Sequence, residues 1–254
     1  MSKDATENRL EECPDVFVDI FNNLILEGHG TLKEEDLIAM PTRAYRRKMD
    51  GELQSGMRDV RKIACGSSRF RLICALENQT GIDHTMPERI MGYEYAGYEE
   101  QVKILMEENE KRRKSAGSKR IFKKQKLAPI VTGVLYFGEK SWTYPRTLHE
   151  MIQFPEGMED ILKKYVADYP VNIVQVAHLT KEQRERLTSD FRIVAEYLAC
   201  KNDREKWTAF LENTKEINHV EELLDVIWEL SHDENYKILK ENIKNKNDRK
   251  QFGK

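Results

Sequence analysis

The chain has 254 residues, of which 39% are hydrophobic and 34% charged, and its formal net charge is −2. This length and apolar content suit one moderately large domain, or a domain with a sizeable appendage. The small net charge excludes a protein that binds nucleic acid through its overall charge, so a polyanion would need a local basic patch. Four cysteines without a C-x-x-C pair favour reduced thiols over a zinc site or a disulfide framework.

The sequence also bears on membranes and targeting. No hydrophobic run approaches the length of a membrane span, and the polar residues 1–4 lack the apolar core of a signal peptide. We therefore expect a cytoplasmic protein with no membrane partner.

The first half of the chain predicts a helix followed by strands. Apolar side chains recur at helical spacing over residues 15–26, and residues 36–40 predict a short strand. A β-hairpin comes next, with arms over residues 59–64 and 69–79 and a turn rich in Gly and Ser at 66–68.

The second half predicts a long helix, two further strands and then helices. Thr85 and Glu88 form a possible capping box at the start of the long helix. Residues 129–137 are apolar on both faces, which is typical of an interior strand, and residues 171–177 predict another strand. This order of elements predicts an α/β (α+β) fold, in which helices flank a mixed central sheet.

The pattern changes to helices alone from Thr180 onward. We therefore expect a core over residues 1–179 and a helical C-terminal region over residues 180–254. Within the core, residues 111–126 form a predicted basic loop. Such a charge run is usually only solvated, but in a chain of net negative charge it is also the best candidate for holding a DNA backbone.

The hairpin carries the residues with the clearest chemical pattern. A register that pairs Cys65 with Arg69 would place Glu77 diagonally across from Asp59. Because side chains alternate across a strand, Asp59, Glu77 and Gln79 would then share one face. Two carboxylates beside an amide suit a hard cation such as Mg²⁺, which would also compensate the cost of burying like charges. Carboxylates are equally routine on solvated faces of sheets, so the spacing alone leaves both interpretations open.

Short motifs spread over about residues 14 to 155 form a more specific pattern in combination. They comprise Asp59-Val60, Ala75-Leu76-Glu77-Asn78-Gln79-Thr80, Met86-Pro87 with Arg89, Met91 and Tyr93, then Tyr98 and Gln101, Pro129-Ile130-Val131, Val134-Leu135-Tyr136-Phe137-Gly138, and Trp142, Pro145, Leu148 and His149. This combination resembles the Rpn family of recombination-promoting nucleases and transposases, a branch of the PD-(D/E)XK nuclease superfamily.

The resemblance implies a restriction-endonuclease-like core and metal-dependent endonuclease cleavage of DNA phosphodiester bonds, linked to recombination or mobile elements. It implies that Asp59 and Glu77 bind Mg²⁺ or Mn²⁺ and that the backbone carbonyl of Asn78 completes the metal shell. Gln79 falls where the wider superfamily has lysine, and it would orient the attacking water. Glu27 could supply a third carboxylate, although a solvated glutamate at a helix end is the simpler interpretation.

Glutamine at position 79 leaves a second class of function open. Glutamine offers only hydrogen bonds, whereas lysine would bring a positive charge to the phosphate. A catalytically weak or inactive nuclease-fold module for DNA binding or assembly is therefore the alternative. A scaffold whose C-terminal helices contact partners is a third possibility, and homo-oligomerisation is left open.

DNA is the expected partner, and the helix after the hairpin and the basic loop offer residues to contact it. Arg89 and Tyr93 lie four residues apart on one helix face, where they could contact phosphate and a base or simply pack on the sheet. The candidates in the loop are Lys119, Arg120, Lys123 and Lys124.

Overall fold

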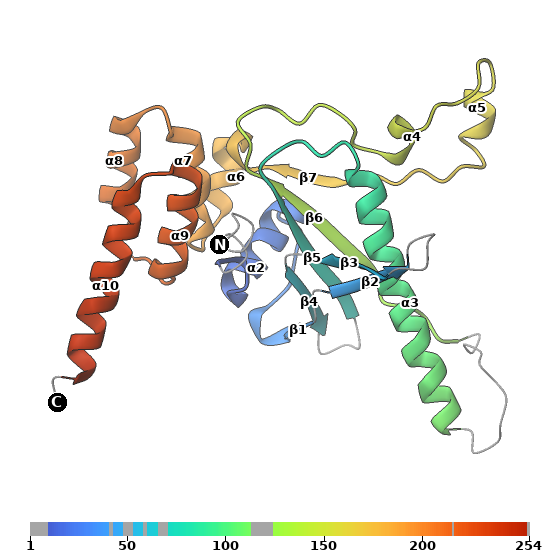
Figure 1. Cartoon of the computed structure of the whole chain (residues 1–254), viewed down its shortest axis with the longest axis horizontal. Helices are drawn as coiled ribbons and strands as arrows, with labels where there is room; N and C mark the ends of the chain where they lie inside the picture. The colour runs from blue at the N-terminus through green and yellow to red at the C-terminus, as the bar shows by residue number, and fades with distance from the viewer. Residues whose placement is uncertain are drawn as a thin grey trace.

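The computed structural model describes residues 10–40, 43–47, 53–57, 60–65, 71–112, 124–214 and 216–252 (Figure 1). It confirms the predicted class, since a five-stranded mixed sheet is flanked by helices. The strands follow the order β1-β4-β5-β6-β7. Their bounds are β1 Leu37–Ala39, β4 Val60–Cys65, β5 Arg71–Gln79, β6 Ile130–Tyr136 and β7 Asn172–Gln175.

The connections between strands explain why the sheet is mixed. A hairpin joins β4 to β5, so these strands are antiparallel, as are β1 and β4. The long helix α3 (Met86–Arg112) lies between β5 and β6 in the chain, and these strands are parallel, as are β6 and β7. Parallel neighbours require such a crossover. The apolar β6 is therefore interior, as its sequence predicts.

Helices cover both faces of the sheet. In Figure 1, α3 lies on one side of the strands and α2 (Pro14–Ile20) on the other. A π-helix, η1 (Phe21–Ile25), continues α2. Alternation along β5 assigns each side chain to a face, so Cys74 and Leu76 join the core under α2 while Glu77 turns toward α3. The core under α3 comprises Met86, Ile90, Val134, Tyr136 and Trp142.

The C-terminal helices extend the core under α2. Phe191, Val194, Leu223 and Ile227 belong to the same buried cluster as Phe17. Thr180 begins this region and forms a capping box with Gln183 at the start of α6. The helices are α6 Lys181–Arg186, α7 Phe191–Cys200, α8 Arg204–Asn213, α9 Val220–Ser231 and α10 Glu234–Phe252. Whether residues 180–254 form a separate domain stays a prediction.

In the described part of the chain, four short helices connect the larger elements. They are η2 Glu34–Asp36, α4 Leu148–Met151, α5 Glu159–Leu162 and η3 Val176–His178. Across the described ranges, no helix combines the length and apolar character that crossing a membrane requires.

The β4–β5 hairpin is confirmed, but its expected register is wrong. Cys65 pairs with Arg71, two residues beyond the expected partner Arg69. The connection over residues 66–70, which lie outside the described residues, is therefore longer than the turn expected from sequence. A shift of two residues keeps every side chain on its face, so Glu77 still points to the side predicted for it.

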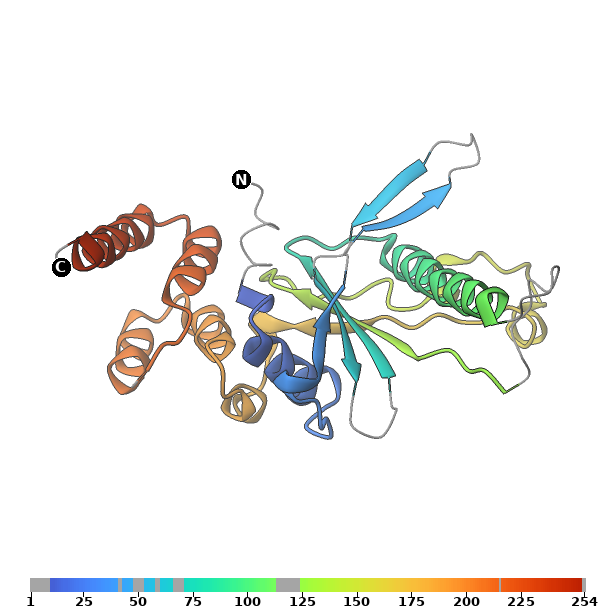
Figure 2. The same ribbon diagram turned by 90° about the horizontal axis from the view of Figure 1, so that it is seen from below.

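A second hairpin was missed by the sequence analysis. Strands β2 (Arg43–Arg47) and β3 (Leu53–Met57) form an antiparallel two-stranded sheet. Figure 2 shows this hairpin extending away from the main sheet. The dipeptide Asp50-Gly51 between the strands is a recognised hairpin signal that could have revealed it.

A buried carboxylate joins the first helix to the C-terminal helices. Asp19 of α2 is 5% exposed. Its Oδ2 accepts hydrogen bonds from the backbone nitrogen and hydroxyl of Ser189, at 2.8 and 2.7 Å, and from the backbone nitrogen of Thr188 at 3.0 Å. Its Oδ1 accepts from Asn23 at 2.7 Å. Asp19 therefore satisfies donors that precede α7.

We predict that Asp19→Ala lowers the free energy of unfolding by about 2–4 kcal/mol, because several buried donors lose their acceptor. Urea denaturation measures the change. Exposed Asp160 provides the matched control, and Asp160→Ala should change stability by less than about 0.5 kcal/mol. Equal effects of the two substitutions would show that the Asp19 contacts do not stabilise the fold.

Candidate functional site

Glu77 forms the centre of the candidate site. It lies near the end of β5 on the face covered by α3, and the residue is 2% exposed. Gln79, two residues further along the same face, donates a hydrogen bond from Nε2 to Glu77 Oε1 at 3.3 Å. Two of the three predicted catalytic residues therefore lie together, as their alternation in the strand predicts.

Arg89 supplies a positive charge to this site. Its guanidinium donates from Nη2 to Glu77 Oε1 and from Nη1 to Asp83 Oδ2, the latter at 2.6 Å. Nη2 also donates to the Tyr93 hydroxyl at 3.2 Å. Because α3 begins at Met86, shortly after β5 ends, its first turn carries Arg89 over Glu77.

The ion pair with Arg89 offers the buried Glu77 a compensating charge other than a metal ion. A bound metal was expected to compensate the burial of Glu77, but Arg89 already places a cation against its carboxylate. Burial of Glu77 alone therefore does not demand a metal ion. Arg89 and Tyr93 are brought together as their spacing predicts, and contact of either with DNA stays a prediction.

Asp83 is a member of the site that the sequence analysis missed. Burial alone would raise the pKa of Asp83, but hydrogen bonds from Arg89 and Thr85 outweigh burial and leave that pKa below its ordinary value of 3.8. Burial alone would also lower the pKa of Arg89, but the hydrogen bond to Asp83 and the charge of Glu77 outweigh it and raise that pKa. Asp83 and Arg89 are six residues apart, which is not a recognised spacing for a pair on one helix face.

Asn78 presents its side chain to the opposite face of the sheet. Its Nδ2 donates to Glu11 Oε2 at 3.0 Å, and both residues are buried. Only the backbone carbonyl of Asn78 is therefore left to serve as a ligand beside Glu77, which is the group that the family pattern implies.

Glu27 does not join the candidate site. It follows η1 and is exposed on the α2 side of the sheet, where it lines a cavity of about 460 Å³ together with Arg186. The neighbouring Ile25 packs against Gly133 and Leu76 on that side, opposite to Glu77. The interpretation of Glu27 as a solvated glutamate is confirmed.

Several predicted site residues cannot be placed. Asp59, Lys119, Arg120 and Lys123 lie outside the described residues, while Lys124 is described and exposed. Among the residues that the structure does describe, no cluster of three or more His, Cys, Asp or Glu side chains could hold a metal ion. The predicted metal site includes Asp59, so it stays a prediction.

The chemistry of the described donors nevertheless suits a hard cation. Glu77 offers carboxylate oxygens, and Gln79 and the Asn78 backbone offer amide oxygens, which are the ligand types that Mg²⁺ prefers. A metal would share Glu77 with Arg89, whose side chain is 30% exposed and thus has room to move toward solvent.

The fold and site together define the class of protein. A mixed five-stranded sheet flanked by helices, with an acidic residue at the end of a hairpin strand, is consistent with a restriction-endonuclease-like fold. The chain matches the model of the family "Putative transposase, YhgA-like" over residues 49–224, which is more than half of its length. It therefore belongs to this family, the Rpn/YhgA-like transposase group of the PD-(D/E)XK nuclease superfamily.

Family membership indicates a role related to transposition or recombination. The comparisons found no match among curated proteins or solved structures.

We predict that Arg89 and Glu77 are energetically coupled. Arg89→Met should lower the free energy of unfolding by about 2–4 kcal/mol, because it removes a cation from a buried carboxylate. In a chain that already carries Glu77→Gln, the same substitution should cost about 1–3 kcal/mol less. Denaturation of the four proteins of this double-mutant cycle measures the coupling. A coupling energy of zero would show that the ion pair contributes nothing to stability.

A second prediction concerns pH. Because the pKa of Asp83 is lowered in the folded protein, its contribution to stability is present above its ordinary pKa of 3.8. That contribution is lost as pH falls through the lower folded-state pKa. The difference in Tm between the parent and Asp83→Asn should therefore shrink as pH falls below about 4. Asp160→Asn serves as the control. A difference between parent and Asp83→Asn that does not change with pH would contradict this role for Asp83.

Proposed function

We propose that this protein is a Mg²⁺-dependent DNA endonuclease of the PD-(D/E)XK type that acts in recombination or transposition. The observation that carries the proposal is the buried Glu77, which lies with Gln79 at the end of the β4–β5 hairpin. In the family pattern these positions hold the metal-binding acid and the residue that replaces the superfamily's lysine.

Chain connectivity supports a second acid at the same place. The described ladder between β4 and β5 ends with the pair Val60–Leu76. Asp59 directly precedes Val60 and Glu77 directly follows Leu76, and consecutive Cα atoms are about 3.8 Å apart. We therefore propose that Asp59 and Glu77 hold the ion together with the Asn78 carbonyl.

The side chains around Glu77 would have distinct tasks. A bound Mg²⁺ would supply stabilisation of negative charge on the phosphate and the leaving oxygen. Gln79 is fixed by its bond to Glu77, and its amide can hold a water molecule by hydrogen bonding. Arg89, partly exposed beside Glu77, offers a guanidinium to an approaching phosphate.

The DNA backbone would also need a larger basic surface. We propose that the loop containing Lys119, Arg120, Lys123 and Lys124 contributes this surface, with Tyr93 near the cleavage site. Each phosphate contact of this kind adds affinity that falls as salt rises.

The Arg89–Glu77 ion pair favours a second candidate function. The guanidinium already occupies Glu77 Oε1, so a metal must compete with it for that oxygen. If Arg89 retains the carboxylate, the protein would be a DNA-binding or assembly module that keeps the nuclease fold without cleaving DNA.

A plasmid-nicking assay with Mg²⁺, Mn²⁺ or chelator separates these functions. We predict that the parent protein nicks DNA only with metal, and that Glu77→Gln or Asp59→Asn slows cleavage by about a hundredfold or more, since either change removes a preorganised charge from the reaction centre. Glu99→Gln, an exposed change on α3, is the matched control and should cleave like the parent.

Two results would decide against the endonuclease. Glu77→Gln that cleaves as fast as Glu99→Gln would remove Glu77 from the site. A parent protein that binds DNA but neither cleaves it nor melts at a higher temperature in Mn²⁺ than in chelator would support the non-catalytic module.

A further inference from the structure

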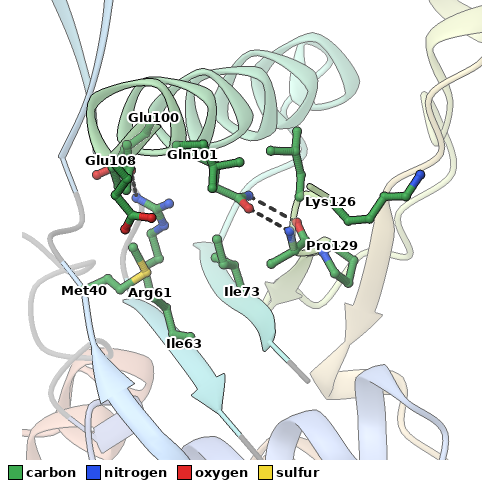
Figure 3. Close-up of a pocket in the computed structure, with 13 residues that line it drawn as sticks. Met40, Arg61, Ile63, Ile73, Glu100, Gln101, Glu108, Lys126 and Pro129 are labelled. Carbon is green, nitrogen blue, oxygen red and sulfur yellow. Dashed lines mark hydrogen bonds and ion pairs between the residues drawn. The ribbon is translucent and has the colours of Figure 1, made fainter. Parts of the chain in front are cut away.

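A separate cavity of about 600 Å³ lies between α3 and the β4–β5 hairpin. It is on the same face of the sheet as Glu77 but nearer the opposite end of β5. Figure 3 shows Ile63 and Ile73 of the two hairpin strands on one side of it and the helix that carries Gln101 on the other. Ile104 and Leu105 add apolar surface from α3. This volume and apolar lining are typical of small-molecule sites.

The wall of the cavity beyond α3 is held in place by paired hydrogen bonds. Gln101 Nε2 donates to the Ala128 carbonyl at 3.1 Å, and the Ala128 backbone nitrogen donates to Gln101 Oε1 at 2.7 Å. These bonds, drawn as dashed lines in Figure 3, fix the segment before β6 against the helix.

Arg61 is the one strongly polar group that β4 buries in this cavity. Its side chain is 6% exposed, and Nη1 donates to Glu100 Oε2 at 3.0 Å. The Nε and Nη2 atoms are buried, and neither has a hydrogen-bond acceptor in the described part of the chain. Leaving charged donors unsatisfied in a buried position is costly.

The two unsatisfied donors have a specific shape. Nε and Nη2 form one edge of the planar guanidinium, and their N–H groups are parallel. This edge matches the two oxygens of a carboxylate, which can accept both hydrogen bonds at once. Gly97 of α3 lies close to this edge, since a Cβ there would stand 3.4 Å from Nη2.

We propose that this cavity binds a small organic carboxylate. Its two oxygens accept hydrogen bonds from Nε and Nη2 of Arg61, and its apolar body lies against Ile63, Ile73 and Ile104. Glu100 engages only Nη1 and its side chain is 46% exposed, so solvent screens its repulsion of the ligand. A phosphate could use the same edge, but the apolar lining would leave its other oxygens unsolvated.

The charges around the cavity permit an anion. Glu100 and Glu108 line it together with Arg61 and Lys126, so two acidic residues face two basic ones. The proposal is independent of the nuclease function, because none of these residues belongs to the site at Glu77.

Calorimetric titration of the full chain tests the proposal with three probes. Octanoate combines a carboxylate with an apolar body, 1-octanol has the body without the charge, and inorganic phosphate has the charge without the body. We expect octanoate to bind at least about tenfold more tightly than either of the others.

Variants of Arg61 and Glu100 test whether the paired donors of the guanidinium, and not its positive charge alone, bind the carboxylate. Arg61→Lys keeps the positive charge but loses the paired donors, so octanoate binding should weaken by about tenfold to a hundredfold. Arg204→Lys, an exposed change on α8, is the matched control and should bind like the parent. Glu100→Gln should bind octanoate as tightly as the parent or more tightly.

A substitution at the mouth of the cavity keeps the test decisive if Arg61→Lys fails to fold. Ile104 is 48% exposed, and Ile104→Trp should block entry and abolish octanoate binding. Ile238→Trp, at a similarly exposed site on α10, should leave binding unchanged. The proposal is overturned if octanoate does not bind, if 1-octanol binds equally well, or if Ile104→Trp binds octanoate like the parent.

Discussion

The contact of Arg89 with both Glu77 and Asp83 determines how the candidate site is built. It ties the first turn of α3 to the end of β5 and to the loop between them. The polypeptide crosses from β5 to the parallel β6 through α3, so this contact holds the start of that crossover helix against the sheet. A buried carboxylate that is paired in this way is costly to separate from its partner. The position of the first turn of α3 therefore depends on the Arg89–Glu77 pair.

Among the side chains that the structure describes, the β4–β5 hairpin buries three charged ones, and each is compensated differently. Glu77 faces Arg89, whereas Arg61 finds one acceptor among the described residues, Glu100, at one of its nitrogens. Lys62, on the other face, donates to the Glu12 carbonyl at 2.7 Å and lies 4.7 Å from the centre of the Phe17 ring. Burial lowers the pKa of Lys62. Buried charges contribute little net stability, so a hairpin that retains several of them is suited to binding or catalysis more than to structural support.

Both proposed sites lie between α3 and the sheet. Glu77 lies near one end of β5 on this face and Ile73 near the other, so the nuclease site and the carboxylate cavity share a strand and a helix. Their chemistry differs, since one centres on acids that suit a hard cation and the other on a guanidinium that suits an anion. Arg61 stands opposite Ala75, between the two places.

The amino-acid sequence by itself determined most of the secondary structure. Apolar spacing predicts the first helix, the hairpin, the interior strand β6 and the C-terminal helices, because periodicity is a local property that burial of one face imposes. Alternation in β5 likewise places Leu76 and Glu77 on opposite faces before any partner is known. The motifs around Glu77 also resemble the family to which the chain belongs.

Only the tertiary structure decided which groups meet. The observed register of the hairpin differs by two residues from the expected one, because strand patterns do not show how long the connection between two strands is. The partners of Glu77, Asn78 and Arg61 depend on how the chain returns across the sheet, which brings in Arg89, Glu11 and Glu100. An ion pair requires two side chains to reach one point in space, and the paths of the connecting segments, not the local sequence, determine whether they do.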